Sequence, residues 1–161
     1  RQGSGEEGAA TGAVDGRQFC SMWAPLDPIP AETTVEFILG SHLWERWFAP
    51  FDAMRDGTVY GGQEFECAPD FDTERDSHNI ASWVLEPGDC LVFHALTVHQ
   101  GKANLTVETR RRAVIGRFLG DDAVYSERKP RSEFPHKIPP LTHGDPLHNA
   151  PEDFPQVWPL S

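Results

Sequence analysis

A histidine and three consecutive arginines lie close together in the sequence, where a short polar turn joins two apolar segments. His99 ends the first apolar segment, and Arg110, Arg111 and Arg112 open the second one eleven to thirteen residues later. An imidazole can bind a metal ion, and a guanidinium can hold a carboxylate through two parallel hydrogen bonds. The residue types and their spacing therefore indicate a metal site that takes a dicarboxylic acid as co-substrate.

For His99 the competing interpretation is an ordinary structural or surface histidine, which is the more common case for a single histidine. Two features favour a ligand. Small residues beside His99 leave space around its ring, and the arginines follow at a suitable distance.

For the arginines the competing interpretation is a solvated basic patch. Strand alternation places Arg110 and Arg112 on one face and Arg111 on the other, with Ala113 and Ile115 on the side of Arg111. An arginine on an inward face needs a buried anion, because an unpaired buried guanidinium is costly. The carboxylate of a co-substrate would meet that need, and so would a structural Asp or Glu.

The segments around these residues are predicted to be strands. Alternating or β-branched apolar runs, separated by turns rich in proline and glycine, predict strands at 18–26, 33–39, 80–85, 90–94, 97–100 and 112–119. Successive short strands with scarcely a helix are typical of an antiparallel sandwich or barrel. The sequence therefore predicts an all-β fold.

One short helix and one long connection interrupt this pattern. Large aromatic residues recur at helical spacing before Pro50, which predicts a short helix that packs on the core; they are Trp44, Trp47, Phe48 and Phe51. The irregular region of about 42–79 is long enough to be a lid that selects the substrate. Its acidic residues lack the spacing of an EF-hand and indicate a solvated loop.

Composition divides the chain into three parts. Residues 1–17 have the composition of a flexible segment without secondary structure, and residues 18–125 hold the β-domain. Residues 126–161 are rich in proline and are expected to form an extended tail over the domain, pinned by Phe154 and Trp158.

Charge and cysteine content narrow the class of protein. The 161 residues carry a net charge of −11, which argues against nucleic acid or an anionic membrane as a partner. Three widely spaced cysteines indicate reduced thiols in an intracellular, cytoplasmic protein. The chain does not begin with Met, so we expect an N-terminal portion, with any targeting signal, to lie outside these residues.

Four segments, in this order, resemble the phytanoyl-CoA dioxygenase family: SMWAPLDP, VEFILGSH, LEPGDCLVFHALTVHQGKANLT and RRRAVIGRFLGDDAVY. The resemblance runs from Phe19 to the C-terminus. It implies a double-stranded β-helix (jelly roll) and a non-haem dioxygenase that uses Fe(II), 2-oxoglutarate and O2. Such an enzyme would hydroxylate a small organic substrate.

The resemblance also assigns residues. His99 resembles the distal histidine ligand of the iron, and Asn104 matches an asparagine that follows it in the same turn. An ungapped match makes Arg110 the 2-oxoglutarate-binding arginine, whereas the better-anchored RRAVIGRFLGDD favours Arg111, which we prefer. Trp23 resembles a tryptophan that lines the co-substrate pocket, with plain core packing as an equal alternative.

The sequence departs from the family pattern at two points. His99-Gln100-Gly101 stands where many members have His-Gly-Ser, so one contact to 2-oxoglutarate is missing. The family also supplies two iron ligands as His-x-Asp shortly before the segment SMW, yet no histidine precedes His42. His143-Gly144-Asp145 matches by letters alone and is expected to be a decoy.

We therefore expect the C-terminal portion of an iron- and 2-oxoglutarate-dependent hydroxylase, with its jelly roll incomplete at the N-terminus. By itself such a chain would be inactive. The alternative is a degenerate family member that serves as a non-catalytic jelly-roll binding domain. A cupin is disfavoured because its His-x-His ligand pair is absent.

Overall fold

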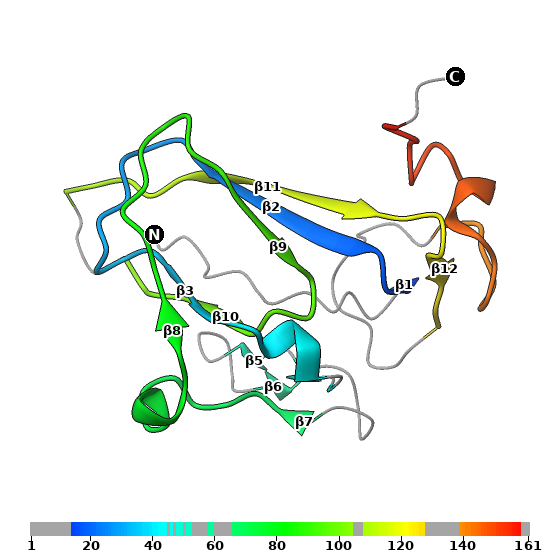
Figure 1. Cartoon of the computed structure of the whole chain (residues 1–161). Helices are drawn as coiled ribbons and strands as arrows, with labels where there is room; N and C mark the ends of the chain where they lie inside the picture. Colours follow the sequence, from blue (N-terminus) through cyan, green and yellow to red (C-terminus); the bar gives the residue numbers. More distant parts are fainter. Residues whose placement is uncertain are drawn as a thin grey trace.

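The computed structural model describes residues 14–44, 46, 48–49, 51–52, 58–59, 66–104, 108–127 and 139–158. Strands dominate these residues (Figure 1). The strands are β1 (Val14–Asp15), β2 (Phe19–Pro25), β3 (Val35–Ile38), β4 (Phe48–Ala49), β5 (Phe51–Asp52), β6 (Thr58–Val59), β7 (Glu66–Cys67), β8 (Ile80–Ala81), β9 (Leu91–His94), β10 (His99–Gly101), β11 (Ala113–Leu119) and β12 (Val124–Tyr125). The helices are the 3-10 turns η1 (Ser41–Trp44), η3 (Arg75–Ser77) and η4 (Leu147–Asn149). Among the described residues, no helix is long and apolar enough to cross a membrane.

The first sheet has the order β11-β2-β9, and both pairs are antiparallel. On the central strand β2, Trp23 lies opposite Leu91 on one side and Ile115 on the other. Successive residues of a strand point to opposite faces, so these three side chains share one face with Ser21. The alternation of this segment in the sequence is that of a strand with one face turned toward the core.

The second sheet has the order β10-β3-β8 and is also antiparallel. His99 lies opposite Phe37, and Gln100 lies opposite Glu36. All four residues of β3 are buried, because this strand is covered on both faces.

Aromatic contacts join the two sheets face to face. The ring of Phe93, on β9, lies 4.8 Å from the ring of Phe37 and 4.8 Å from that of His99. Figure 1 shows β11, β2 and β9 lying over β3 and β10. The predicted antiparallel sandwich is thus confirmed, and each of the six predicted strands overlaps an observed one.

The outer face of the second sheet is covered by the connection that leads to β8. Ile38, Phe71 and Val98 form a buried cluster there, with Trp44, Phe48 and Ile80 packed around it. Of the predicted lid, 42–79, the structure describes residues 42–44, 46, 48–49, 51–52, 58–59 and 66–79; among these, Phe71 is buried in the cluster, and Trp44 and Phe48 pack against it. The part of the lid in substrate selection stays a prediction.

The predicted aromatic helix is wrong beyond its first turn. The 3-10 turn η1 ends at Trp44, and Phe48 lies in β4, where it pairs with Glu66. Ser41 does not cap a longer helix, because its hydroxyl donates to the Ile38 carbonyl at 2.7 Å and accepts from the Val98 amide at 2.8 Å. Trp47 lies outside the described residues.

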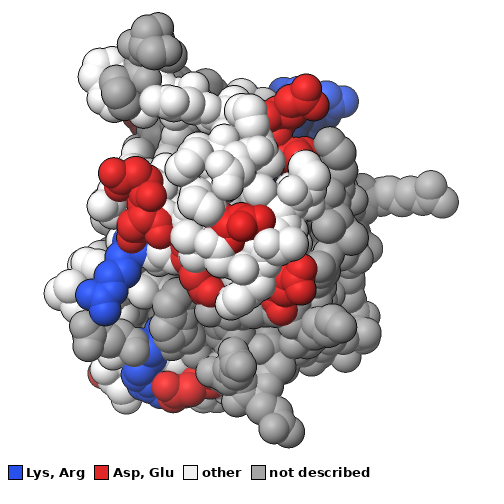
Figure 2. All heavy atoms as spheres, turned by 90° about the vertical axis from the view of Figure 1, so that its right-hand side faces the viewer, with Lys and Arg blue, Asp and Glu red and all other residues white. Residues whose placement is uncertain are grey.

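The two ends of the described chain meet in a second buried cluster. Its members come from β1, from the region of β12 and from residues 139–158; they are Val14, Ala123, Tyr125, Leu141, Leu147 and Ala150. Figure 2 shows the side of the molecule that carries this cluster, with acidic side chains scattered over it and the basic ones at its margin. That distribution agrees with the net charge of −11.

This cluster corrects two expectations about the ends. Residues 1–17 were expected to lack secondary structure, yet β1 pairs with β12 and Val14 is buried. The sequence did not predict β1 because a strand of two residues is too short to show periodicity. The part of the tail that the structure describes, residues 126–127 and 139–158, forms turns and η4 rather than an extended run. Phe154 packs on the cluster as expected, but Trp158 is 82% exposed and does not pin the tail.

Candidate active site

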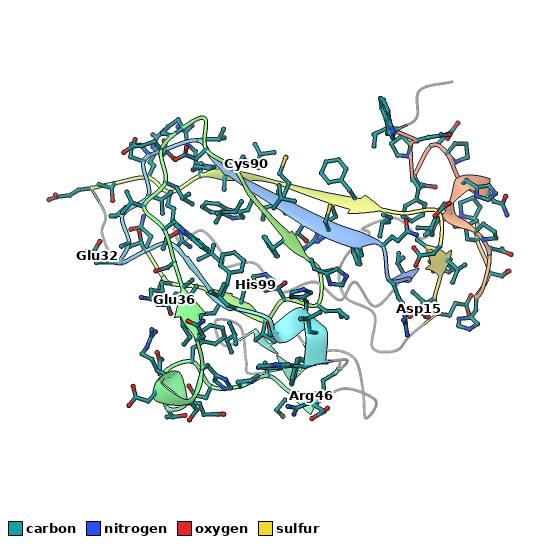
Figure 3. All side chains as sticks on the ribbon, viewed as in Figure 1. Asp15, Glu32, Glu36, Arg46, Cys90 and His99 are labelled. Carbon is teal, nitrogen blue, oxygen red and sulfur yellow. The ribbon has the colours of Figure 1, made fainter. Side chains whose placement is uncertain are left out.

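His99 begins β10 and faces the space between the two sheets (Figure 3). Its Nδ1 atom lies 2.7 Å from the carbonyl oxygen of Thr97. A carbonyl oxygen only accepts hydrogen bonds, so Nδ1 is the donor, and in the neutral imidazole Nε2 carries the lone pair. Metal-binding histidines commonly donate their second ring N–H to a backbone carbonyl in this way, which fixes the tautomer and the orientation of the ring.

Aromatic rings surround the His99 imidazole on two sides. Phe37 stacks on it at 5.7 Å between ring centroids, and Phe93 meets it edge-on. Trp83 extends the group, with its ring 5.9 Å from that of Phe37. Phe37 and Phe93 fix the His99 plane by packing, and Trp83 supports Phe37.

The three arginines have three different environments. Arg112 donates two side-chain hydrogen bonds to the Asp27 carboxylate, at 2.8 and 3.0 Å, and this bonding lowers the pKa of Asp27 to about 2. Arg110 is exposed. Arg111 is partly buried, and burial lowers the pKa of its guanidinium.

Backbone carbonyls, rather than a carboxylate, contact Arg111. Its Nη1 donates to the carbonyl oxygen of Thr33 at 2.5 Å and to that of Lys102. Within the described part of the chain, no carboxylate pairs with this guanidinium. Of the two candidates for binding 2-oxoglutarate, Arg110 is exposed, whereas Arg111 is partly buried and has no described carboxylate beside it.

Asn104 stabilises the turn between His99 and the arginines. Its side-chain Nδ2 donates to the carbonyl oxygen of Thr109 at 2.8 Å. This hydrogen bond spans residues 105–107 in the sequence, which lie outside the described part of the chain. A direct contact between Asn104 and a co-substrate stays a prediction.

Trp23 lies on the inward face of the first sheet, opposite Leu91 and Ile115. Ile115 shares this face and is nevertheless 37% exposed, so solvent reaches this edge of the space between the sheets. Both predicted roles of Trp23, lining a pocket and packing in the core, are compatible with this position.

The described residues do not form an iron site by themselves. They contain no group of three or more His, Cys, Asp or Glu side chains placed to hold a metal ion. His94 is engaged in the backbone: its Nε2 donates to the Arg17 carbonyl at 2.9 Å, and its Nδ1 accepts from the Leu96 amide at 3.1 Å. His99 is thus the one predicted iron ligand in the described part of the chain.

The His143-Gly144-Asp145 sequence forms a turn. The Asp145 carboxylate accepts two hydrogen bonds from Thr142, both at 2.8 Å, and Gly144 has a positive φ of 90°. These contacts support its interpretation as a decoy.

Sequence reasoning did not single out Glu36, a charged residue that is only 3% exposed. The signal was present, because Glu36 is the one acidic residue in the β-branched and aromatic run TTVEFIL. Buried carboxylates need charged partners, and Glu36 has two, Arg75 and Lys102.

Comparison with solved structures defines the class of fold. The chain is similar to the epimerase SnoN in complex with Fe3+, α-ketoglutarate and nogalamycin RO, with a TM-score of 0.62 and 22% identity over 91% of this chain and 54% of that one. It is also similar to a structure described as the non-haem α-ketoglutarate-dependent epimerase SnoN from nogalamycin biosynthesis, with a TM-score of 0.56 and 22% identity over 83% and 46%. The chain spans about half the length of these structures. Its fold is the jelly roll of 2-oxoglutarate-dependent oxygenases.

The family follows from the sequence itself. Residues 8–113, more than half of the chain, match the family described as phytanoyl-CoA dioxygenase (PhyH). The chain therefore belongs to the phytanoyl-CoA dioxygenase family, whose enzymes use Fe(II) and 2-oxoglutarate. No curated protein matches the sequence.

Proposed function

We propose that this chain is part of a non-haem Fe(II)- and 2-oxoglutarate-dependent dioxygenase that hydroxylates a small organic substrate. His99 contributes one iron ligand and Arg111 binds the distal carboxylate of 2-oxoglutarate. The His-x-Asp pair of the family would be supplied by residues outside the 161 of this chain. Iron and O2 would supply the oxidising chemistry.

The observation that carries this proposal is the environment of Arg111. Its two carbonyl contacts both use Nη1, and no described residue accepts from Nη2 or Nε. A carboxylate is the acceptor that matches two parallel guanidinium N–H groups, and it would offset the cost of removing this charge from water. The other two arginines lack this combination of burial and missing anion.

Similar proteins support a small-molecule substrate. SnoN was crystallised with nogalamycin RO as well as with iron and α-ketoglutarate. SnoN is described as an epimerase, so product analysis distinguishes hydroxylation from epimerisation.

The second candidate is a non-catalytic jelly-roll binding domain. It is favoured by one observation, that the described residues hold a single predicted iron ligand. An in-frame His-x-Asp encoded shortly upstream of Arg1 would support the enzyme, and its absence would refute catalysis by this protein.

The co-substrate role can be tested on the 161-residue chain by titration with 2-oxoglutarate, followed by ligand-observed NMR. We expect Arg111→Ala to weaken binding about 10- to 100-fold, as expected for the loss of charge-assisted hydrogen bonds. Arg110→Ala is the matched control, because it removes the same charge from an exposed neighbour. A larger loss in Arg110→Ala would show that the register of the resemblance is off by one residue.

Iron binding gives a separate prediction. Anaerobic titration with Fe(II) is expected to show weak binding by the 161-residue chain, because one histidine is insufficient for a stable site. His143→Ala is the control and should leave the titration unchanged. Tight stoichiometric binding that is abolished by His99→Ala alone would contradict the proposed absence of the His-x-Asp pair.

A further inference from the structure

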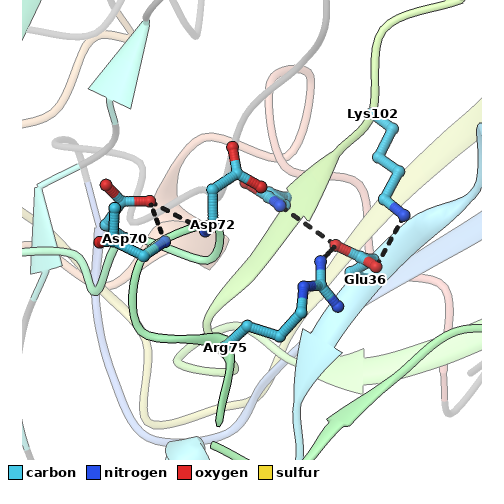
Figure 4. Close-up of polar contacts among 7 residues, drawn as sticks. Glu36, Asp70, Asp72, Arg75 and Lys102 are labelled. Carbon is cyan, nitrogen blue, oxygen red and sulfur yellow. Dashed lines mark hydrogen bonds and ion pairs between the residues drawn. The ribbon is translucent and has the colours of Figure 1, made fainter. Parts of the chain in front are cut away.

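Lys102 contacts both Arg111 and Glu36. Its carbonyl oxygen accepts a hydrogen bond from Arg111 Nη1, and its side-chain Nζ lies 2.8 Å from Oε1 of Glu36 (Figure 4). Lys102 directly follows β10, and Arg111 precedes β11. One residue therefore joins the predicted co-substrate arginine to a buried carboxylate of β3.

Glu36 is well suited to fix the end of β10 against β3. It lies opposite Gln100 in the sheet, and Gln100 Nε2 donates to Oε2 of Glu36 at 3.1 Å. Arg75 Nη2 donates to the same oxygen at 2.7 Å. Burial raises the pKa of Glu36, but the hydrogen bonds from Arg75, Lys102 and Gln100 together lower it to about 2, so Glu36 is ionised at neutral pH.

The two carbonyls that hold Arg111 lie just outside the ends of the strands that Glu36 joins. Thr33 lies two residues before β3, and Lys102 lies one residue after β10. The distance between these carbonyls depends on how the ends of β3 and β10 are held together. The Glu36–Lys102 ion pair spans the same two strand ends and has few ways to rearrange, because the Glu36 side chain is only 4% exposed.

We infer that Glu36 and Lys102 are positioning residues for Arg111, holding its guanidinium where it can receive the carboxylate of the co-substrate. This inference rests on the proposed function, because it concerns the same arginine. Neither residue is assigned a contact with the co-substrate itself. Their effect passes through the backbone carbonyl of Lys102.

Arg75 provides a matched comparison. It pairs with the same Glu36 carboxylate at a similar distance, but it comes from η3 and makes no described contact with Arg111. Lys102→Met and Arg75→Met each remove one cation from Glu36. A purely structural role of the cluster would therefore give the two variants similar effects on ligand affinity.

The experiment measures the affinity of the 161-residue chain for 2-oxoglutarate, together with the Arg111 Nε–Hε signal in ¹⁵N NMR, assigned by its loss in Arg111→Ala. We expect Lys102→Met to weaken binding about fivefold and Arg75→Met less than about twofold, because small displacements of a binding group reduce affinity strongly. The Arg111 signal should shift in Lys102→Met without ligand and stay in place in Arg75→Met. Lys102→Arg should restore most of the affinity.

The outcomes separate this inference from the proposed function. If Arg111→Ala leaves 2-oxoglutarate binding unchanged, the proposed function fails. If Arg111→Ala weakens binding while Lys102→Met neither weakens it nor shifts the Arg111 signal, only the positioning role is overturned. Should Lys102→Met fail to fold, Glu36→Gln tests the same ion pair and is expected to shift the same signal.

Discussion

Replacing Phe37 with alanine is expected to lower the free energy of unfolding by about 3–5 kcal/mol, the range for a buried phenylalanine. Phe37 is 4% exposed, and its ring contacts Phe93, Trp83 and His99. Alanine would leave a cavity between the two sheets that rigid strands cannot fill. Urea denaturation followed by tryptophan fluorescence measures the change.

Phe118→Ala is the matched control for this prediction. Phe118 lies on β11 and is 41% exposed. The same truncation should therefore lower the free energy of unfolding by only about 1 kcal/mol, because less apolar surface is returned to water. Equal losses in the two variants would show that the space beside His99 is not the packed centre of the sandwich.

Stability is expected to fall between about pH 4.5 and pH 2 because of Glu36. The pKa of this carboxyl is about 2 in the folded chain against an ordinary 4.5. The folded state thus holds the ionised form more strongly than the unfolded state does. The contribution is fully present above about pH 4.5, is lost as the pH falls toward 2, and is worth about 3 kcal/mol by linkage.

Urea midpoints measured across this pH range test the assignment. Glu36→Gln should give a flatter profile than the parent chain, because a glutamine does not titrate. Asp27→Asn removes another carboxyl whose pKa is lowered to about 2, and it should keep the part of the slope due to Glu36. A Glu36→Gln profile as steep as that of the parent would assign the acid sensitivity to other groups.

The sequence predicted those elements whose signal is local. The alternation of Phe19–Pro25 and the β-branched run of Val35–Ile38 located two central strands, because burial on defined faces requires such residues. The prediction of a helix at 44–51 was wrong, because aromatic residues can also recur at helical spacing where a 3-10 turn is followed by short strands. The hydroxyl of Ser41, just before this segment, accepts a hydrogen bond from the Val98 amide 57 residues away, a contact that no local pattern reveals.

The residues of the candidate site were predicted from local signals, whereas the contacts between them were not. His99 and the two arginine candidates follow from motif and spacing, and the family resemblance named their roles. The contact between Arg111 and the Thr33 carbonyl joins residues 78 positions apart and depends on strand register. The pairing of Glu36 with Lys102 likewise needs β3 and β10 to be neighbours, which no local pattern reveals.

The two buried clusters have no residue in common. One holds Ile38, Phe71 and Val98 beneath the second sheet, whereas the other joins β1 and β12 to residues 139–158. Cooperative opening involves residues that pack on one another, and separate clusters can open at different free energies. The end of the chain can therefore exchange its amide protons, or be cut by a protease, while β10, which begins with His99, and the residues around Arg111 stay closed.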